Sequence, residues 1–405
     1  MKHLKVKLTT LSLLAILAIS VFTTSCQQED NVIPNMNETT NPELDERFKN
    51  YEIVQIDNQE ILNTIENQGD GEVNLDMRSA TPSSALSDWS FKMKRLQVQA
   101  DDFKFHLIGE GGTHKEVQTP ETYVMQGFLG DNTGEVLMMI NETNLHAEIV
   151  ENGHTYRLEP LTDFILDAAP NEYIKYNIAD IIDNEKRTCS FDESMYDMQE
   201  VEESDQALEE RAGNCLKVEV TFMGDFELYA YKFGYNSGNA YNWMYWRVIN
   251  AGKMYYSYNG FPINFIIKGG YVNTWNGYIS NSSNASSLLN GWLNFGNNNS
   301  WLQKGDANIL FTGKSLHNNV AGVAYLRAIC TWYAYGVVEH TWNSQSADII
   351  TAHEIGHILG ANHSNGGFMN SYLNGQTWMH SQTWNDLNNW VWGHSWCLGQ
   401  WGCQW

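Results

Sequence analysis

The segment HEIGHILGANH, residues 353–363, constrains the fold of this chain more than any other feature. On a helix, His353 and His357 are one turn apart, so both imidazoles project from the same side. That spacing suits two nitrogens on one tetrahedral zinc ion. Gly360 is expected to end the helix in a left-handed conformation, after which the chain turns back and brings His363 to the metal. Three protein nitrogens leave a fourth position open, as in a catalytic rather than a structural zinc site.

Glu354 directly follows the first of these histidines, so it flanks the metal without having to bind it. It is placed to hold and deprotonate a water molecule at the open zinc position. HExxH arises by chance in about 1% of chains of this length, and the added glycine and histidine lower that frequency about a thousandfold. These odds disfavour the alternative, an ordinary helix whose histidines belong to its surface or core. The sequence predicts a zinc hydrolase with Glu354 as general base.

The residues before the histidines predict the start of the same helix. In SADIITA, Ser346 is expected to cap the first turn and Asp348 to lie at its positive end. Further upstream, YNWMYWRVIN and ASSLLNGWLNF favour helices, the first of them amphipathic. FPINFIIKGG, DANILFTG and VAGVAYL favour strands. Strands that alternate with helices indicate a mixed sheet covered by helices.

HEIGHILGANH followed by Met369 in GGFMNSYL resembles the metzincin signature HExxHxxGxxH with its Met-turn. DANILFTGKSLHNNVAGVAYLRAIC, residues 306–330, is similar to the adamalysin (reprolysin) branch of these zinc peptidases. YEIV and NGHTYRLEPL resemble parts of the propeptide of that branch. The resemblance implies an α+β fold, with a mixed twisted sheet, a zinc helix and a Met-turn, preceded by a β-rich prodomain. It also implies that the three histidines bind Zn²⁺ and that Met369 packs beneath the metal.

The resemblance further assigns a substrate cleft. Gly322, Val323, Ala324 and Tyr325 correspond to its upper edge strand, where an extended peptide adds through backbone hydrogen bonds. The alternative for this strand is an ordinary buried position in the sheet. Two features depart from the branch: Ser364 stands where adamalysins usually have aspartate, and Met369 follows His363 by only six residues.

The N-terminus is typical of an exported chain. Three lysines precede an apolar run, residues 8–22, which is too short to span a bilayer stably, so residues 1–25 are expected to be a signal peptide. A small residue followed by Cys26 resembles the lipobox of bacterial lipoproteins, and the acidic pair after it resembles the surface-export tag of Bacteroidetes-type lipoproteins. We expect Cys26 to carry lipid and residues 26–47 to form a polar tether. An ordinary secreted protein with a stray cysteine is the alternative.

Charge divides the rest of the chain into two parts. Residues 212–405 hold eight acidic and eight basic side chains, so the net charge of −24 falls on residues 1–211. Residues 48–211 combine turn-separated, alternating segments with an acidic linker, which favours a β-rich prodomain. The composition changes after EER, so an activating protease is expected to cut between Arg211 and Ala212. Neither part offers a basic face, which disfavours a nucleic acid partner.

The six cysteines suggest two disulfides and a latch. If Cys26 is lipidated, Cys189 is the odd one, because the other four lie together after residue 212. The resemblance implies a disulfide from Cys330 to Cys397 or Cys403, which leaves Cys215 for the other. A thiolate is a good zinc ligand, so Cys189 could occupy the open position and keep the enzyme latent. The alternatives are a bystander thiol or a carboxylate latch such as Asp192.

Together these features predict a zinc endopeptidase made as a latent precursor, with residues 212–405 as its catalytic domain. Its partners would be extracellular proteins or peptides, an activating protease, and the membrane through the lipid. It would be an outer-membrane or cell-surface lipoprotein whose catalytic domain leaves after processing. The alternative is a zincin-fold adhesin or glycan-binding module, favoured by fourteen tryptophans after residue 212.

Overall fold

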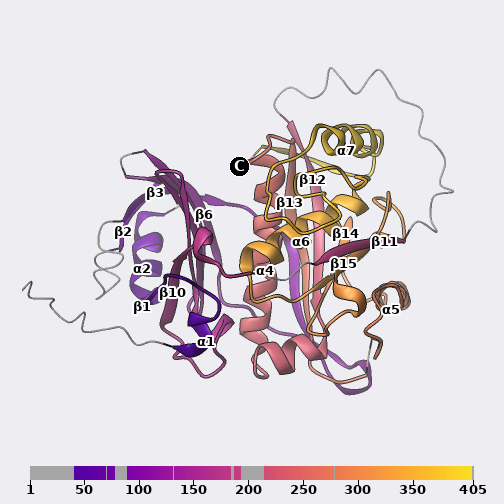
Figure 1. The fold of residues 1–405 in the computed structure, drawn as a ribbon, viewed down its shortest axis with the longest axis horizontal. Coiled ribbons are helices and arrows are strands. Elements are labelled where there is room, and N and C mark those ends of the chain that lie inside the picture. The colour runs from indigo at the N-terminus through magenta and orange to yellow at the C-terminus, as the bar shows by residue number, and fades with distance from the viewer. Residues whose placement is uncertain are drawn as a thin grey trace, which may run out of the picture. The chain divides into compact units, whose positions relative to one another are not determined.

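Two β-sheets organise residues 42–405 (Figure 1). The structure is a computed structural model that describes residues 41–69, 71–77, 89–130, 132–183, 187–192, 214–277 and 279–403. The expected signal peptide, Cys26 and the expected cut between Arg211 and Ala212 lie outside these residues. No described helix is both long and apolar enough to cross a membrane. We call residues 42–192 the N-terminal part and residues 214–403 the C-terminal part.

The first sheet is antiparallel, and all of its strands come from the N-terminal part. Its order is β1-β10-β9-β8-β7-β6-β3-β2. The strands are β1 (Glu52–Gln55), β2 (Val73–Asp76), β3 (Ser90–Leu96), β6 (Tyr123–Leu129), β7 (Gly134–Ile140), β8 (Leu145–Glu151), β9 (His154–Pro160) and β10 (Glu172–Asn177). Two helices, α1 (Pro42–Asp45) and α2 (Asn58–Gln68), accompany it. The helix α2 was not expected from the sequence: Asp57 caps it, and Ile61, Leu62 and Ile65 enter the core of this part.

The second sheet is mixed and has the order β11-β15-β16-β14-β12-β13-β4-β5, with β17 beside β12. Its strands are β4 (Gln99–Ile108), β5 (His114–Glu116), β11 (Thr188–Asp192), β12 (Asn214–Gly224), β13 (Ile263–Asn273), β14 (Ala307–Thr312), β15 (Val320–Tyr325), β16 (Tyr335–Glu339) and β17 (Gly399–Gly402). Its helices are α4 (Ser237–Tyr256), α5 (Ala285–Asn298), α6 (Ser344–Ile358) and α7 (Ser381–Gly393). Short helical turns occur at Glu110–Gly112, Leu161–Asp163, Ile178–Asp180, Leu228–Lys232 and His317–Asn319. The predicted α+β class is confirmed.

Three strands of the N-terminal part belong to the second sheet. β4 pairs with β13 in parallel, β5 pairs with β4, and β11 pairs with β15 in parallel at the opposite edge. Residues 48–211 were expected to form one β-rich prodomain, so the place of β4, β5 and β11 in the second sheet was not predicted. Because a sheet is held by backbone hydrogen bonds, side-chain periodicity does not identify a strand's partner.

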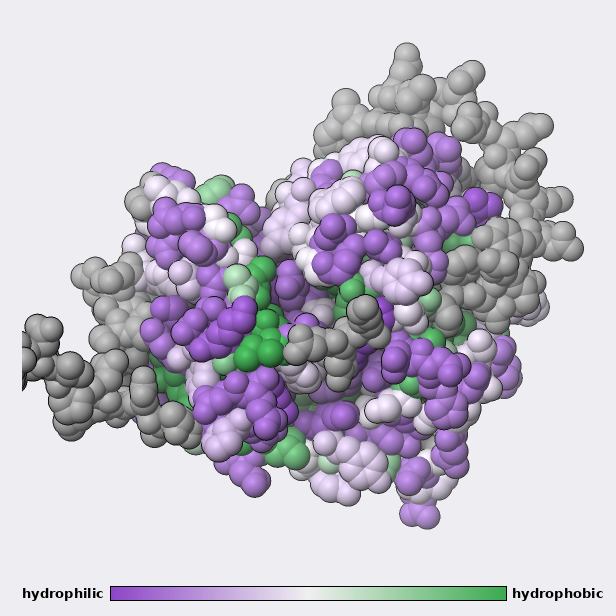
Figure 2. Space-filling model, in the orientation of Figure 1, coloured by the Kyte–Doolittle hydropathy of each residue, from purple (hydrophilic) through white to green (hydrophobic). Residues whose placement is uncertain are grey.

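The helix α4 differs from its expected amphipathic character, because every residue from Ala240 to Tyr255 is buried. It packs on β12 and β13, and its polar side chains meet β8 and β9 of the first sheet. Hydrophilic residues nevertheless dominate the molecular face in Figure 2, where apolar residues show only in small areas. The apolar side chains of α4 and its two buried charged residues, Arg247 and Lys253, lie in the interior.

The helix α6 starts three residues earlier than expected. Asn343, not Ser346, is its N-cap and accepts a hydrogen bond from the Ser346 backbone N–H at 3.1 Å. Asp348 consequently lies beyond the first turn, where it pairs with Arg157 and Arg247 instead of the helix end. The expectations for Ser346 and Asp348 were therefore wrong, although the helix itself was predicted.

Candidate metal centre and active site

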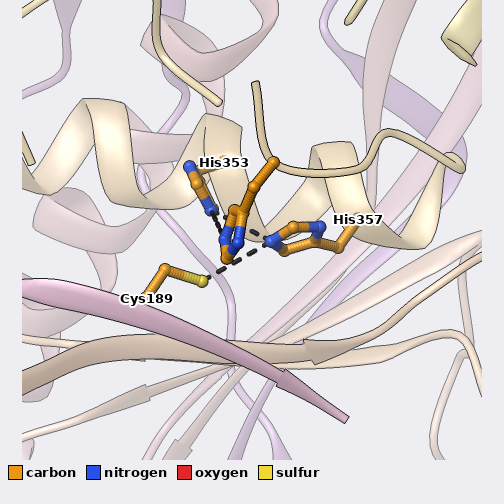
Figure 3. A group of neighbouring side chains, drawn as sticks. Cys189, His353 and His357 are labelled. Carbon is orange, nitrogen blue, oxygen red and sulfur yellow. Dashed lines mark hydrogen bonds between the residues drawn. The ribbon is translucent and has the colours of Figure 1, made fainter. Parts of the chain in front are cut away.

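Three histidine nitrogens converge at one point beside α6 (Figure 3). His353 and His357 project from the same side of the helix, and their Nε2 atoms are 3.0 Å apart. Gly360 has a φ of +105°, and the chain that turns there brings Nε2 of His363 within 3.2 Å of Nε2 of His353. The helical spacing of His353 and His357, together with the turn at Gly360 that brings back His363, thus produces the cluster.

The other ring nitrogens fix the orientation of two of these histidines. Nδ1 of His353 lies 2.7 Å from the Phe368 carbonyl oxygen, and Nδ1 of His357 lies 2.8 Å from that of Ala361. A carbonyl only accepts, so both Nδ1 atoms carry the proton and both Nε2 lone pairs face the centre. Burial lowers the pKa of His353 to about 3, that of His363 to about 4, and that of His357 well below its usual value. All three rings are therefore neutral, which is the form that binds metal.

Cys189 completes a set of four donors. Its Sγ lies 3.5 Å from Nε2 of His357, and the four donor atoms lie within 4.8 Å of one another. A tetrahedral zinc has nitrogens about 3.3 Å apart, and its sulfur ligand lies about 3.5–3.6 Å from each nitrogen. Two nitrogen spacings of 3.0 and 3.2 Å and the 3.5 Å spacing from the Cys189 sulfur to the His357 nitrogen are close to these values. The residues present fit a zinc ion.

Glu354 lies beside the cluster and is fully buried. The Cys189 thiol donates to its Oε1 at 3.1 Å, and its buried Oε2 has no hydrogen-bond partner among the described residues. Burial raises the pKa of Glu354 well above its usual value. A carboxylate with a raised pKa and one uncommitted oxygen is suited to accept a proton and pass it on.

The strand β15 carries Gly322, Val323, Ala324 and Tyr325, and it borders this centre. A Cβ added to Gly322 would come within 2.3 Å of Oε1 of Glu354, so only glycine allows the strand and the carboxylate to lie this close. On its outer edge β15 pairs with β11, where Cys189 is opposite Gly322. The segment that supplies the thiol therefore occupies the edge expected to bind substrate.

An apolar pocket opens next to Glu354 and His353. Its lining residues are Thr188, Cys189, Ala321, Ile349, Ile350, His353, Glu354, Phe368, Asn370, Tyr372, Leu373 and Asn374. Asn370, Tyr372, Leu373 and Asn374, which follow Met369, form one wall of it. Tyr372 is at the rim and 63% exposed.

Met369 is fully buried beneath α6, where a Cβ on Gly356 would come within 2.5 Å of its sulfur. It thus packs against α6 at Gly356, in agreement with the packing role that the resemblance implies. Ser364 starts this turn: its N–H donates to the Met369 carbonyl at 2.9 Å, and Thr383 donates to its hydroxyl at 3.0 Å. The serine is therefore tied to α7.

The structure joins Cys215 to Cys403 and Cys330 to Cys397, which resolves the pairing that the sequence left open. The side chain of Asp192 lies outside the described ones.

A cluster of buried charges near the start of α6 was not predicted from the sequence. Glu148, Arg157 and Glu159 of the first sheet meet Arg247, Lys253 and Asp348 of the C-terminal part. A sign of it was present, because His146 and Glu148 in LHAEIVE, and Arg157 and Glu159 in HTYRLEP, are two residues apart and so share a face of their strand. That pattern more often indicates a solvent-facing side of a strand.

The comparison with protein families agrees with this geometry. Residues 218–388 match the family model Reprolysin_5, metallo-peptidase family M12. The chain is similar in structure to metalloproteinase-II from Bacteroides fragilis, known from a crystal structure, with 12% sequence identity and a TM-score of 0.49. That similarity covers 84% of this chain and 96% of the other. No curated protein matches the sequence.

Proposed function

We propose that this chain is a zinc-dependent endopeptidase made as a latent precursor. The observation that carries the proposal is the convergence of three neutral histidine Nε2 atoms beside a buried carboxylate, at spacings that fit zinc. The M12 metallopeptidase match over residues 218–388 supports it from the sequence side. Zinc, when bound, acts as a Lewis acid that polarises the scissile carbonyl.

The chain's own residues then divide the work. The three histidines hold the ion, and Glu354 accepts the proton of the attacking water and transfers it to the leaving amine. The edge of β15 aligns an extended peptide through its backbone. Ile349, Ile350 and Phe368 line the neighbouring pocket, which favours an apolar side chain just after the cleaved bond.

Latency follows from the position of β11. Cys189 contributes the fourth donor to the centre, and the strand around it covers the edge of β15. The strand therefore denies a peptide both the metal and the backbone edge. In this proposal a protease cuts between Arg211 and Ala212 on an exported lipoprotein anchored through Cys26. Extracellular proteins or peptides are then the substrates, and the catalytic domain leaves the surface once it is free.

The function is tested on the C-terminal part, after the chain has been cut before residue 214 and the N-terminal fragment has been dissociated and removed. With one zinc per chain, it should hydrolyse an unfolded protein substrate. Glu354→Gln, treated identically and with the same zinc content, should lose at least about 100-fold in kcat. If the unsubstituted domain is folded, zinc-loaded and inert, the proposal is wrong and the glycan-binding alternative takes its place.

The cysteine latch is tested on the uncut chain. Cys189→Ala should raise peptidase activity above that of the unsubstituted uncut chain. In the cobalt-substituted protein it should also abolish the thiolate-to-cobalt charge-transfer band. An unchanged band would show that the thiol does not bind the metal. If the band is lost but the uncut chain stays inactive, coverage of β15 by β11 would be the cause of latency.

A further inference from the structure

We infer that a cut in the linker does not by itself separate the two parts of the chain. The N-terminal part stays bound to the C-terminal part as a non-covalent inhibitor, so activation needs a second event that removes it. The retention of the N-terminal part does not depend on the proposed function, whereas the persistence of latency rests on it. Three contacts at different places carry this inference.

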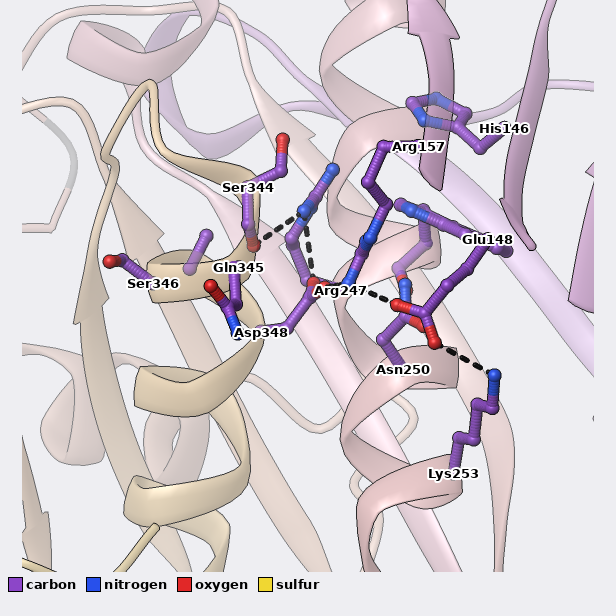
Figure 4. A network of polar contacts seen from close by, with 12 residues as sticks. His146, Glu148, Arg157, Arg247, Asn250, Lys253, Ser344, Gln345, Ser346 and Asp348 are labelled. Atoms are coloured by element: carbon purple, nitrogen blue, oxygen red, sulfur yellow. Dashed lines mark hydrogen bonds and ion pairs between the residues drawn. The ribbon is translucent and has the colours of Figure 1, made fainter. Parts of the chain in front are cut away.

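The first contact is the buried charge network (Figure 4). Lys253 donates to Glu148 at 2.8 Å, and Arg247 donates to Glu159 at 2.8 Å. Arg157 crosses in the opposite direction and lies 2.7 Å from Asp348. The side chains in these three pairs are at most 3% exposed. Each pair joins the N-terminal part to the C-terminal part.

The charges of this network balance only when both parts are present. The N-terminal part supplies two carboxylates and one guanidinium, and the C-terminal part supplies two cations and one carboxylate. Separation would leave each side with an uncompensated charge among apolar neighbours. Tyr258, Tyr176 and Ser344 also donate to these carboxylates, so their oxygens are well satisfied in the joined state. Substitution of one partner in the joined state would therefore leave the other as a buried, unpaired charge, which is costly.

The second contact is the strand β4 at the edge of β13. Lys104 to Ile108 pair in register with Gly269 to Asn273, and the Thr274 N–H donates to the Ile108 carbonyl at 2.8 Å. Phe105 packs on Tyr241 of α4 with ring centroids 4.5 Å apart. One apolar core contains side chains of both parts; those from the N-terminal part are Leu96, Val98, Phe105, Ile108, Val124, Leu137 and Met139. Departure of this part would expose a strand edge and a core face together.

The third contact is β11, which pairs with β15 over the active site. It lies before residues 193–213, so a cut in that segment leaves β11 on the N-terminal side. The three contacts therefore act on the same fragment. The edge strand, the core and the charge network hold β11 and its thiol near the centre after the chain is cut.

The test uses the full chain with the recognition sequence of a site-specific protease placed within residues 193–211. After complete cleavage, confirmed on a denaturing gel, the two fragments should co-elute in native size-exclusion chromatography at micromolar concentration. Peptidase activity should stay within about twofold of the uncut chain and rise when the N-terminal fragment is dissociated and removed. Separation of the fragments on cleavage would overturn the inference. Co-elution with full activity would overturn its inhibitory half.

A pair of substitutions tests whether the charge network retains the N-terminal fragment. Glu148→Gln should raise the dissociation constant of the cut complex at least about 30-fold. Glu116→Gln is the matched control, because its pair with Lys104 at 2.9 Å is exposed. Equal effects of the two substitutions would contradict the role of the network. If Glu148→Gln prevents folding, the co-elution test on the unsubstituted cut chain still decides the matter. If the fragments co-elute but the C-terminal fragment stays inert after the N-terminal fragment is removed, only the proposed function is contradicted.

Discussion

Gly322 is the residue on which the geometry of Glu354 depends most directly. A methyl group there would meet the carboxylate oxygen at 2.3 Å and its carbon at 2.7 Å. We expect Gly322→Ala to displace Glu354 and lower kcat of the freed domain at least about tenfold, since small misplacements of a catalytic group are costly.

This is measured as kcat, KM and zinc content side by side. Zinc content should not change, because the histidines are held by Phe368 and Ala361 rather than by β15. Gly238→Ala serves as the control, since a methyl there meets only the Asn236 side chain at 3.3 Å. Loss of zinc from Gly322→Ala would show that the strand supports the metal instead.

Asp306 gives a pH-dependent prediction. Burial raises its pKa to about 6 from an ordinary 3.8. Between these values the folded state binds more protons than the unfolded state, so this residue makes stability fall as pH rises from about 4 to 6. Asp306→Asn should remove that fall and stabilise the protein by about 1–3 kcal/mol at pH 7.5, but little at pH 4. Denaturant unfolding at both pH values measures it, and equal effects at the two would contradict the assignment.

At the scale of elements, α6 packs closely against Met369 and Tyr255 because Gly356 has no side chain. A methyl there would meet the Met369 sulfur at 2.5 Å and the Tyr255 hydroxyl at 2.9 Å. That hydroxyl donates to the Ala352 carbonyl at 2.7 Å, which ties α4 to α6. We expect Gly356→Ala to cost about 1–3 kcal/mol through overpacking.

The free energy of unfolding of Gly356→Ala and of the unsubstituted chain tests this prediction. Gly356→Ala combined with a smaller residue at Met369 should recover part of the loss. Absence of any recovery would place the strain elsewhere on the helix.

Elements with strong local patterns were predictable from the sequence, and those that depend on distant partners were not. The helix α6 and the convergence of its histidines follow from spacing and from Gly360 alone. The choice of Asn343 over Ser346 as cap was missed because both are good caps. The burial of α4 was missed because its second covering layer comes from β8 and β9, about 100 residues earlier in the chain. The strand β4 was identified, but its sheet was not.

At the scale of the whole molecule, the expected lipid at Cys26 would fix the location of everything that stays bound to the N-terminal part. We expect Cys26→Ala to move the uncut chain from the membrane fraction to the soluble fraction of cells. Cys189→Ala is the matched control and should remain with the membranes. Immunoblotting of the two fractions measures the distribution, and membrane retention of Cys26→Ala would disprove the lipid anchor.

The sharing of one apolar core by both parts also bears on how the protein folds. β4 precedes β13 by more than 150 residues, so it is synthesised first and is available as a template when the later strands emerge. A C-terminal part made alone would fold with the β13 edge bare, with Lys253 lacking Glu148 and with Arg247 lacking Glu159. Such an edge invites aggregation. We therefore expect the N-terminal part to act as a folding scaffold. Separate synthesis of residues 214–403 should give insoluble chains, and co-expression of residues 42–192 should rescue them.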